Sequence, residues 1–205
     1  MAQRISFDNK VDLVTSAAAR INKSTAADWN DVKSVVNSHA DNIEALNGGS
    51  GWALYADSEH TSESPLVVEE GQTVQLTNNA NTVIDTYLPN GVTSFYDNVS
   101  DRVYAQSVGD AYIIRISFEA ETNNNNGYAE INFNIGVSEG QNIILTKDIN
   151  FPRGTGSVRA FTSSSVVYSL DAFVANGCAF EIRSITGETS IFNINFMIAR
   201  IHKAG

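Results

Sequence analysis

The N-terminal quarter of the chain contains apolar residues at the spacing of a helix. Between Thr25 and Leu46 they recur at alternating intervals of three and four residues, with one polar residue in the series. This heptad pattern, about two and a half repeats long, is typical of a helix that packs against copies of itself. The positions that form the predicted seam are Trp29, Val32, Val36, His39, Ile43 and Leu46. We therefore expect a short coiled coil made by several copies of the chain.

The segments on either side of this helix suggest how the chain is divided. A first helical pattern covers residues 7–21 and is interrupted at 22–25. Three glycines fall within 48–51, a composition typical of a helix end followed by a joint. We expect a helical anchoring arm and stalk over 1–47, a glycine-rich joint over 48–51 and a head over 52–205.

Apolar residues in the head alternate with polar ones, which is the period of a half-buried strand. The alternation is clearest in 111–120 and 127–137, and the Asn126-Gly127 step between them predicts a hairpin. Further strands are expected at 73–76, 143–145, 158–161, 166–170, 179–185 and 191–201. No helical pattern interrupts the head. Short strands separated by glycine and asparagine turns are typical of an antiparallel β-sandwich, so we expect a mainly β protein.

The last predicted strand, 191–201, is apolar on both faces. Such a strand is expected at the centre of a sheet or where subunits meet. The residues assigned to the core or to a subunit contact are Phe192, Ile194, Phe196, Met197, Ile198 and Ile201.

Composition narrows the possible partners. The chain has 205 residues and a formal net charge of −10, which repels nucleic acid. Its N-terminus lacks the apolar core of a signal peptide, and no apolar run approaches the ~20 residues that span a bilayer. We expect synthesis in a cytoplasm, with no membrane insertion and no bound nucleic acid.

The residues that could carry chemistry do not form a known set. His39, His60 and His202 lie far apart in sequence, and Cys178 is the only cysteine. We therefore expect no catalytic residues, no metal and no cofactor. Three copies of His39 could meet at a trimer axis, where they would hold an anion or water or set the register, or His39 could lie at the edge of a loose seam; both interpretations stay open.

One loop could contact sugars. Asn123, Asn124, Asn125 and Asn126 follow one another in the turn after the strand at 111–120. Their amides could hydrogen-bond to sugar hydroxyls, although asparagine runs are also ordinary turn chemistry.

Two stretches resemble known families. STAADWNDVKSVVNSHADNIEAL, residues 24–46, resembles the TAADxNxIKxxVN-type helix near the N-terminus of many bacteriophage fibre and structural proteins. The segments DAYIIRISFEAETNNNNGYAEINFNIG, VYSLDAFVANGCAFEIRSITG and INFMIARIHK are similar to the jelly roll of the complement and tumour-necrosis-factor type. Together they resemble trimeric phage fibre or tail-tip proteins, in which a coiled stalk carries a β-sandwich head.

The resemblance implies a function and a set of partners. It implies a homotrimeric virion protein, a head fibre, tail fibre or decoration protein, that is exposed on the particle surface. Residues 1–28 would then bind other virion proteins. The alternative is a receptor-binding tip that recognises a bacterial surface glycan through the asparagine loop.

Overall fold

The structure, a computed structural model, describes residues 26–137, 142–152 and 155–204. The chain divides into two compact units, Met1–Gly48 and Gly49–Gly205, which we describe separately. The helix predicted at 7–21 lies outside the described residues, as does most of the proposed anchoring segment 1–28.

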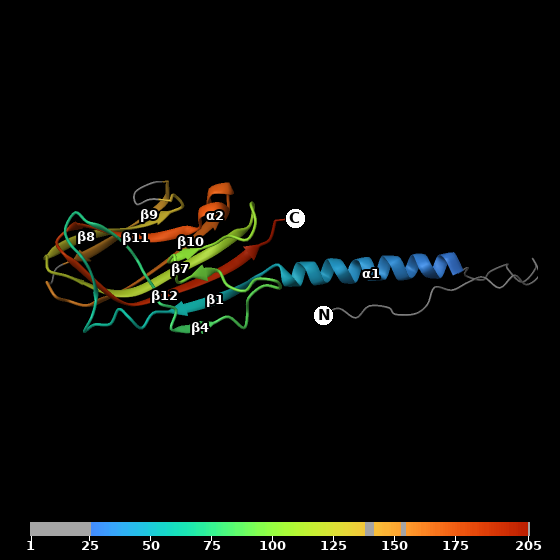
Figure 1. Ribbon diagram of the computed structural model, residues 1–205, viewed down its shortest axis with the longest axis horizontal. Coiled ribbons are helices and arrows are strands. Elements are labelled where there is room, and N and C mark those ends of the chain that lie inside the picture. The colour runs from blue at the N-terminus through green and yellow to red at the C-terminus, as the bar shows by residue number, and fades with distance from the viewer. Residues whose placement is uncertain (1–25, 138–141, 153–154, 205) are drawn as a thin grey trace, which may run out of the picture. The chain divides into compact units, whose positions relative to one another are not determined.

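The described residues of the first unit form one long helix, α1, which spans Ala26–Gly48 (Figure 1). This confirms the helix predicted for residues 25–46. Alanine and the straight-chain residues of the sequence favour helix, and the helix ends at the first glycine of the joint, where backbone freedom in the unfolded chain opposes further helix.

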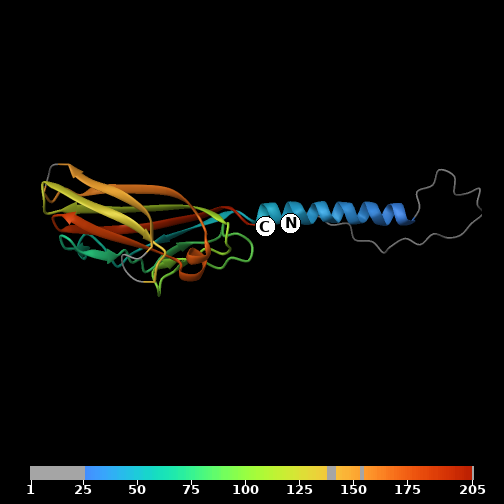
Figure 2. The same ribbon diagram turned by 90° about the horizontal axis from the view of Figure 1, so that it is seen from above.

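The second unit is a sandwich of two antiparallel sheets, seen from two sides in Figures 1 and 2. Sheet 1 has the order β10 (Arg159–Tyr168), β7 (Ala111–Thr122), β12 (Thr189–His202), β1 (Gly51–Ala56) and β4 (Thr82–Ile84), and β2 (Leu66–Val68) also pairs with β12. Sheet 2 has the order β5 (Tyr96–Asp97), β6 (Arg102–Val103), β11 (Cys178–Thr186), β8 (Asn126–Asn134) and β9 (Ile143–Pro152), and β3 (Thr73–Gln75) also pairs with β11. The chain crosses between the sheets from β7 to β8, from β9 to β10, from β10 to β11 and from β11 to β12, whereas β8 and β9 are neighbours in sheet 2. This is the arrangement of a jelly roll, and the predicted fold class is confirmed.

The predicted hairpin between 111–120 and 127–137 is wrong. β7 pairs with β10 and β12 in sheet 1, whereas β8 pairs with β9 and β11 in sheet 2. The loop between them therefore crosses from one sheet to the other. The Asn126-Gly127 step correctly marked a chain reversal, but a turn signal does not determine which strands pair after it.

The head also contains a helix that the sequence analysis did not predict. α2 spans Asp171–Asn176 and ends at Gly177, whose φ of 69° lies in the left-handed region. Six residues are too few to show a helical period, so the segment looked like a loop. Its Phe173 is buried in the core of the sandwich.

One predicted break between strands is also wrong. The segments 158–161 and 166–170 belong to a single strand, β10, which pairs with β7 without interruption from Arg159 to Tyr168. Thr162 to Ser165 look like a turn in the sequence, but they lie in the strand because each finds a backbone partner on β7.

The core lies between the inner faces of the two sheets and is rich in aromatic rings. Phe196 of β12 lies with its ring centroid 4.9 Å from that of Phe180 and 5.3 Å from that of Tyr96. β12 pairs with β7 on one side and β1 on the other, so it is a central strand. Phe192, Ile194, Phe196 and Ile198 are buried, Met197 is partly buried, and Ile201 is 48% exposed.

A bulge in β12 changes which of its residues face the core. Asn193 has a φ of 56°, and the register with β7 shifts between Phe192 and Asn195. Ile191 therefore joins Ile194 in the central cluster, whereas Phe192 is buried outside that cluster.

Candidate assembly surfaces

The seam predicted on α1 is exposed in the single chain. Trp29 is 44% exposed, Val32 50% and Ile43 52%, and Val36 and His39 are exposed as well. Val35, which borders the seam, is also exposed, and the side chain of Leu46 lies outside the described residues. An isolated helix with its apolar stripe in water is marginal, and a surface that covered this stripe would stabilise α1.

The outer face of sheet 1 carries a second apolar surface, which the strand register defines. One row across the strands reads Val166, Ile113, Ala199 and Trp52. The next row reads Ser164, Arg115, Met197, Leu54 and Ile84. Tyr168, which is 69% exposed, lies beside the first row on β10. We call this set of outward residues the assembly face.

The assembly face ends abruptly along the strands. Beyond the row of Met197 the outward residues are polar, beginning with Thr162, Ser117 and Asn195. Antiparallel sheets that have water on their outer side normally carry polar residues there. The apolar rows are therefore confined to the end of the sheet where β1 begins, at Gly51.

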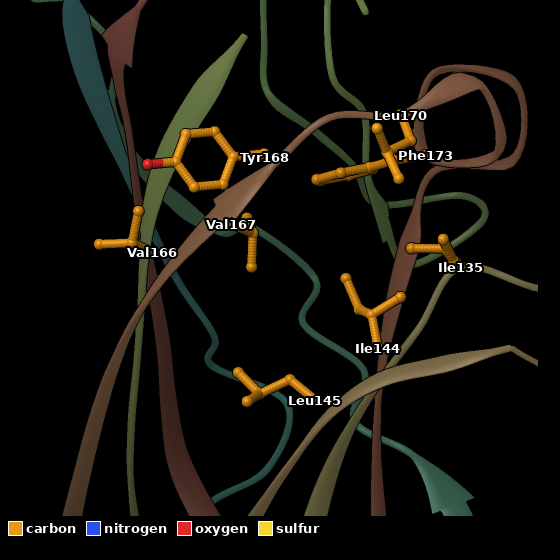
Figure 3. Close-up of a pocket in the computed structure, with 8 residues that line it drawn as sticks. All are labelled: Ile135, Ile144, Leu145, Val166, Val167, Tyr168, Leu170 and Phe173. Atoms are coloured by element: carbon orange, nitrogen blue, oxygen red, sulfur yellow. The ribbon is translucent and has the colours of Figure 1, made fainter. Parts of the chain in front are cut away.

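An open edge lies beside the assembly face, where β9 and β10 border the two sheets. A cleft of about 300 Å³ opens there, lined by Ile135, Ile144, Leu145, Val166, Val167, Tyr168, Leu170 and Phe173. Figure 3 shows Val167 pointing from β10 toward Leu145 and Ile144, whereas Val166 and Tyr168 lie on the other side of the strand. Leu170 is 65% exposed at the rim. We call this region the open edge.

The outer face of sheet 2 is polar instead. Asn134 Nδ2 donates to Glu181 Oε1 at 2.7 Å, and Thr146 Oγ1 donates to Asn132 Oδ1 at 2.7 Å. Further along β8, the Tyr128 hydroxyl donates to Asp148 at 2.7 Å, and this hydrogen bond raises the pKa of Tyr128 to about 12.

The asparagine loop lies at the opposite end of the sandwich from Gly51. Gly51 pairs with Arg200 near one end of β12, whereas Thr122, just before the loop, pairs with Thr189 at the other end. The loop side chains largely hold the loop itself. Asn123 Oδ1 accepts from the Glu188 backbone N–H, Asn124 Oδ1 from that of Asn126, and Asn125 Oδ1 from Thr155.

A histidine cluster joins two loops of the head. His60 Nδ1 lies 2.9 Å from Asp57 Oδ2, and His60 Nε2 lies 3.5 Å from Thr77 Oγ1. Burial raises the pKa of Asp57, but hydrogen bonds from the backbone of Asn79 and from His60 outweigh it, so the net shift is downward. These contacts tie the segment after β1 to the segment after β3, and we interpret the cluster as structural.

Other chemistry is limited in the part of the chain that the structure describes. Cys178 is fully buried, and this burial raises the pKa of its thiol, which keeps it protonated and unreactive at neutral pH. Within residues 26–137, 142–152 and 155–204, no three histidine, cysteine or acidic residues gather as a metal site. Over the same ranges, no helix has the length and apolar character needed to cross a membrane.

The sequence analysis missed most of the assembly face. It selected Met197 of this face, but not Trp52, Leu54 or Val166. A signal was present, because β1 reads GWALYA and is apolar on both faces in the same way as 191–201. Ile113 lay in the alternating segment 111–120 and Val166 in the strand predicted at 166–170, and only the register shows that they continue the same patch.

Comparisons with known proteins identify similar folds and no family. No protein-family model matches the chain, and no curated protein matches it in sequence. The structure of Eiger TNF from S. frugiperda is similar over 76% of this chain and 95% of its own, with a TM-score of 0.46 and 10% identity. PRD1 vertex protein P5 is similar over 75% of this chain and 73% of its own (TM-score 0.42, 12% identity). The globular domain of zebrafish complement 1qA protein is similar over 75% and 99% (TM-score 0.42, 10% identity).

Proposed function

We propose that the protein is a non-enzymatic structural component of a bacteriophage virion, a homotrimer whose N-terminal arm attaches it to the particle and whose jelly-roll head is displayed outside. The observation that carries the proposal is the exposed seam of α1, because an apolar stripe at heptad spacing fits copies of the same helix. The likeness of residues 24–46 to phage fibre helices supports the assignment to a virion.

The head supports self-association independently of the helix. Its assembly face is a cluster of apolar side chains on a sheet face that would otherwise be hydrated. About two and a half heptads hold a trimer weakly, so a second apolar contact is needed for a stable assembly.

Substitutions in the seam test the role of α1. Val36→Asp or Ile43→Asp places three like charges at the axis and is expected to dissociate the trimer or make it concentration-dependent in native mass spectrometry. Ser34→Asp is the matched control, since Ser34 is exposed on the side of the helix away from the seam. If the seam variants stay as trimeric as the control, the helix is only a tether and this part of the proposal fails.

Detection in particles tests the virion assignment. An antibody against the head is expected to find the protein in gradient-purified phage particles at a constant ratio to the capsid protein. Gold labelling through the C-terminus should then locate it on the capsid or on the tail. Protein that is abundant in infected-cell lysate but lost from purified particles would contradict the assignment.

The second candidate function is a receptor-binding tip. It is favoured by the position of the asparagine loop at the end of the sandwich opposite Gly51, where the chain enters the head. Shortening the loop by Asn124 and Asn125 is expected to abolish adsorption of particles to the host if the loop binds a glycan. Unchanged adsorption, with the trimer intact, would leave the structural role alone.

A further inference from the structure

We propose that Asn90 is a site of spontaneous deamidation, at which the protein converts a neutral side-chain amide into a carboxylate without an enzyme. In this reaction the backbone nitrogen of the next residue attacks the side-chain carbonyl carbon of the asparagine, and ammonia leaves. The product is a five-membered succinimide ring, which one water molecule opens at either carbonyl to give aspartate or isoaspartate. The inference concerns the single chain and does not depend on the proposed homotrimer.

The chain has several asparagines that could react in this way. Glycine favours the reaction when it follows asparagine, because it has no Cβ to shield its backbone nitrogen. The asparagines that precede a glycine are Asn47, Asn90, Asn126 and Asn176. Since the two reacting residues are the same in each, differences in reactivity come from the fold. The reaction needs an asparagine side chain that can rotate, and a glycine N–H that is free of hydrogen bonds.

The step from Asn176 to Gly177 is held on both sides. Asn176 Nδ2 donates to the carbonyl oxygen of Ile135 at 3.0 Å, and the backbone oxygen of Asn176 accepts from Arg102 Nε at 2.7 Å. The Gly177 N–H donates to the carbonyl oxygen of Phe173 at 3.0 Å. Ring closure would break these bonds at the end of α2, so this step is protected.

Regular structure holds two other steps. The Gly127 N–H donates to the carbonyl oxygen of Asn124 at 3.3 Å, and Gly127 is buried in β8, directly after Asn126. Asn47 and Gly48 both lie within α1, where the helical backbone conformation keeps the glycine nitrogen away from the preceding side chain. Both steps are therefore protected as long as the protein is folded.

The step from Asn90 to Gly91 has none of this protection. The two residues are the centre of a turn, which is closed by the Val92 N–H donating to the carbonyl oxygen of Pro89 at 3.1 Å. Both are exposed, and Gly91, whose φ is 79°, has open space where a Cβ would stand. Within the part of the chain that the structure describes, neither the Asn90 side chain nor the Gly91 N–H has a hydrogen bond. Opening this exposed turn is the only structural change that ring closure requires.

The turn adjoins the point where the chain enters the head. The Trp52 N–H donates to the carbonyl oxygen of Tyr87 at 2.9 Å, and the two rings are stacked with centroids 5.0 Å apart. A Cβ on Gly51 would lie 2.8 Å from the backbone nitrogen of Pro89. Deamidation therefore adds a negative charge, and in isoaspartate an extra backbone methylene, directly after the segment on which β1 begins.

Peptide mapping by mass spectrometry of the full chain, incubated in mildly alkaline buffer, tests the inference. A matched sample is incubated in denaturant until every asparagine–glycine step has converted, which gives the intrinsic reactivity of each. In the folded protein, Asn90 is expected to convert at nearly its denatured rate. The other three are expected to convert at least about tenfold more slowly than in denaturant, the effect of having to break one or two hydrogen bonds first.

The variant Asn90→Gln is the matched control, because it keeps the amide but would have to close a less favourable six-membered ring. Ion-exchange chromatography of the folded wild-type protein is expected to show a new acidic species that grows with time, and the variant is expected to lack it. An Asn90 that stays intact in the folded protein while the denatured chain converts would overturn the inference. Conversion of folded Asn126 or Asn176 as fast as Asn90, or the same acidic species in Asn90→Gln, would also overturn it.

Discussion

The two sheets of the head are alike inside and different outside. Each turns an apolar inner face toward the shared core, but the outward residues of β12 in sheet 1 are Met197 and Ala199, whereas those of β8 in sheet 2 are Asn132 and Asn134. The outward amides of sheet 2 are nevertheless buried, since Asn132 is 5% exposed and Asn134 is 1% exposed. Antiparallel sheets with water on their outer side normally carry polar residues there, so the apolar rows of sheet 1 are the surface that the proposed association would cover.

The outer face of sheet 2 is ordered by hydrogen bonds between its side chains. The outward amides and carboxylates of sheet 2 bond to one another across strands, as in the pairs Asn134 with Glu181 and Thr146 with Asn132. Buried polar groups must find such partners, since an unpaired one costs about 1–3 kcal/mol. These pairs satisfy outward polar groups of sheet 2 within one chain, although Glu181 Oε2 is buried without a hydrogen-bond partner among the described residues. The apolar rows of sheet 1 are what the proposed association would cover.

The largest expected effect comes from a residue that serves both sheets. Phe196 is fully buried, and its ring meets Phe180 of sheet 2. Phe196→Ala is expected to lower the free energy of unfolding by about 3–5 kcal/mol, because it leaves a cavity between the sheets. Urea denaturation, monitored by tryptophan fluorescence, measures this free energy of unfolding. A loss below about 1 kcal/mol would mean that the sheets do not pack as described.

A charge on each outer face then compares the two faces directly. Met197→Asp is expected to weaken association by about 3 kcal/mol, roughly a hundredfold in the dissociation constant, because the carboxylate is buried in an apolar contact. Thr73→Asp places the same charge on the outer side of sheet 2 on β3, away from β9, and is expected to leave association unchanged. Sedimentation equilibrium measures the dissociation constants of both variants. Equal changes in the two constants would remove the distinction between the faces.

A smaller effect is expected from the one charge within the assembly face. Arg115→Glu is expected to weaken association by roughly tenfold, because it replaces the one positive charge of the assembly face with a negative one in a chain whose net charge is already −10. Arg115→Gln removes the charge, matches Arg115→Glu in side-chain length, and is expected to fall between the wild type and Arg115→Glu. If Arg115→Gln weakened association more than Arg115→Glu does, the charge of Arg115 would play no part.

The smallest effect concerns one phenol on the solvent face. Tyr128 is expected to titrate at about pH 12, because its hydroxyl donates to Asp148 and ionisation would place two negative charges together. Asp148→Asn should bring the pKa of Tyr128 back toward the ordinary value near 10. Ultraviolet absorbance of each protein minus its Tyr128→Phe variant isolates this tyrosine; identical midpoints would show that the bond to Asp148 is not formed in solution.

The sequence was sufficient for the fold class and the long elements, because both rest on local periodicity. The heptad spacing of Trp29 to Ile43 predicts α1, and the alternation in 111–120 predicts β7. It was not sufficient for strand pairing, since β7 and β8 are joined by a turn yet belong to different sheets. The choice of partner depends on contacts between residues that are distant in the chain, such as Thr122 with Thr189.

The candidate surfaces were predictable to different degrees. The seam of α1 follows from one short stretch of sequence, so its residues could be named in advance. The assembly face joins single residues from several strands, among them Leu54, Arg115 and Met197, and only the register places them side by side. The asparagine loop was found as a loop, but the use of its side-chain oxygens within the loop depends on Glu188 and Thr155, which are remote in sequence.

Native mass spectrometry of the full chain at micromolar concentration tests the central claim most directly. The account predicts a single dominant species at three times the chain mass of 22.2 kDa. The same species should persist on dilution further than that of Met197→Asp or Ile43→Asp. A clean monomer would contradict the homotrimer, and with it the role in association proposed for the seam of α1 and for the assembly face.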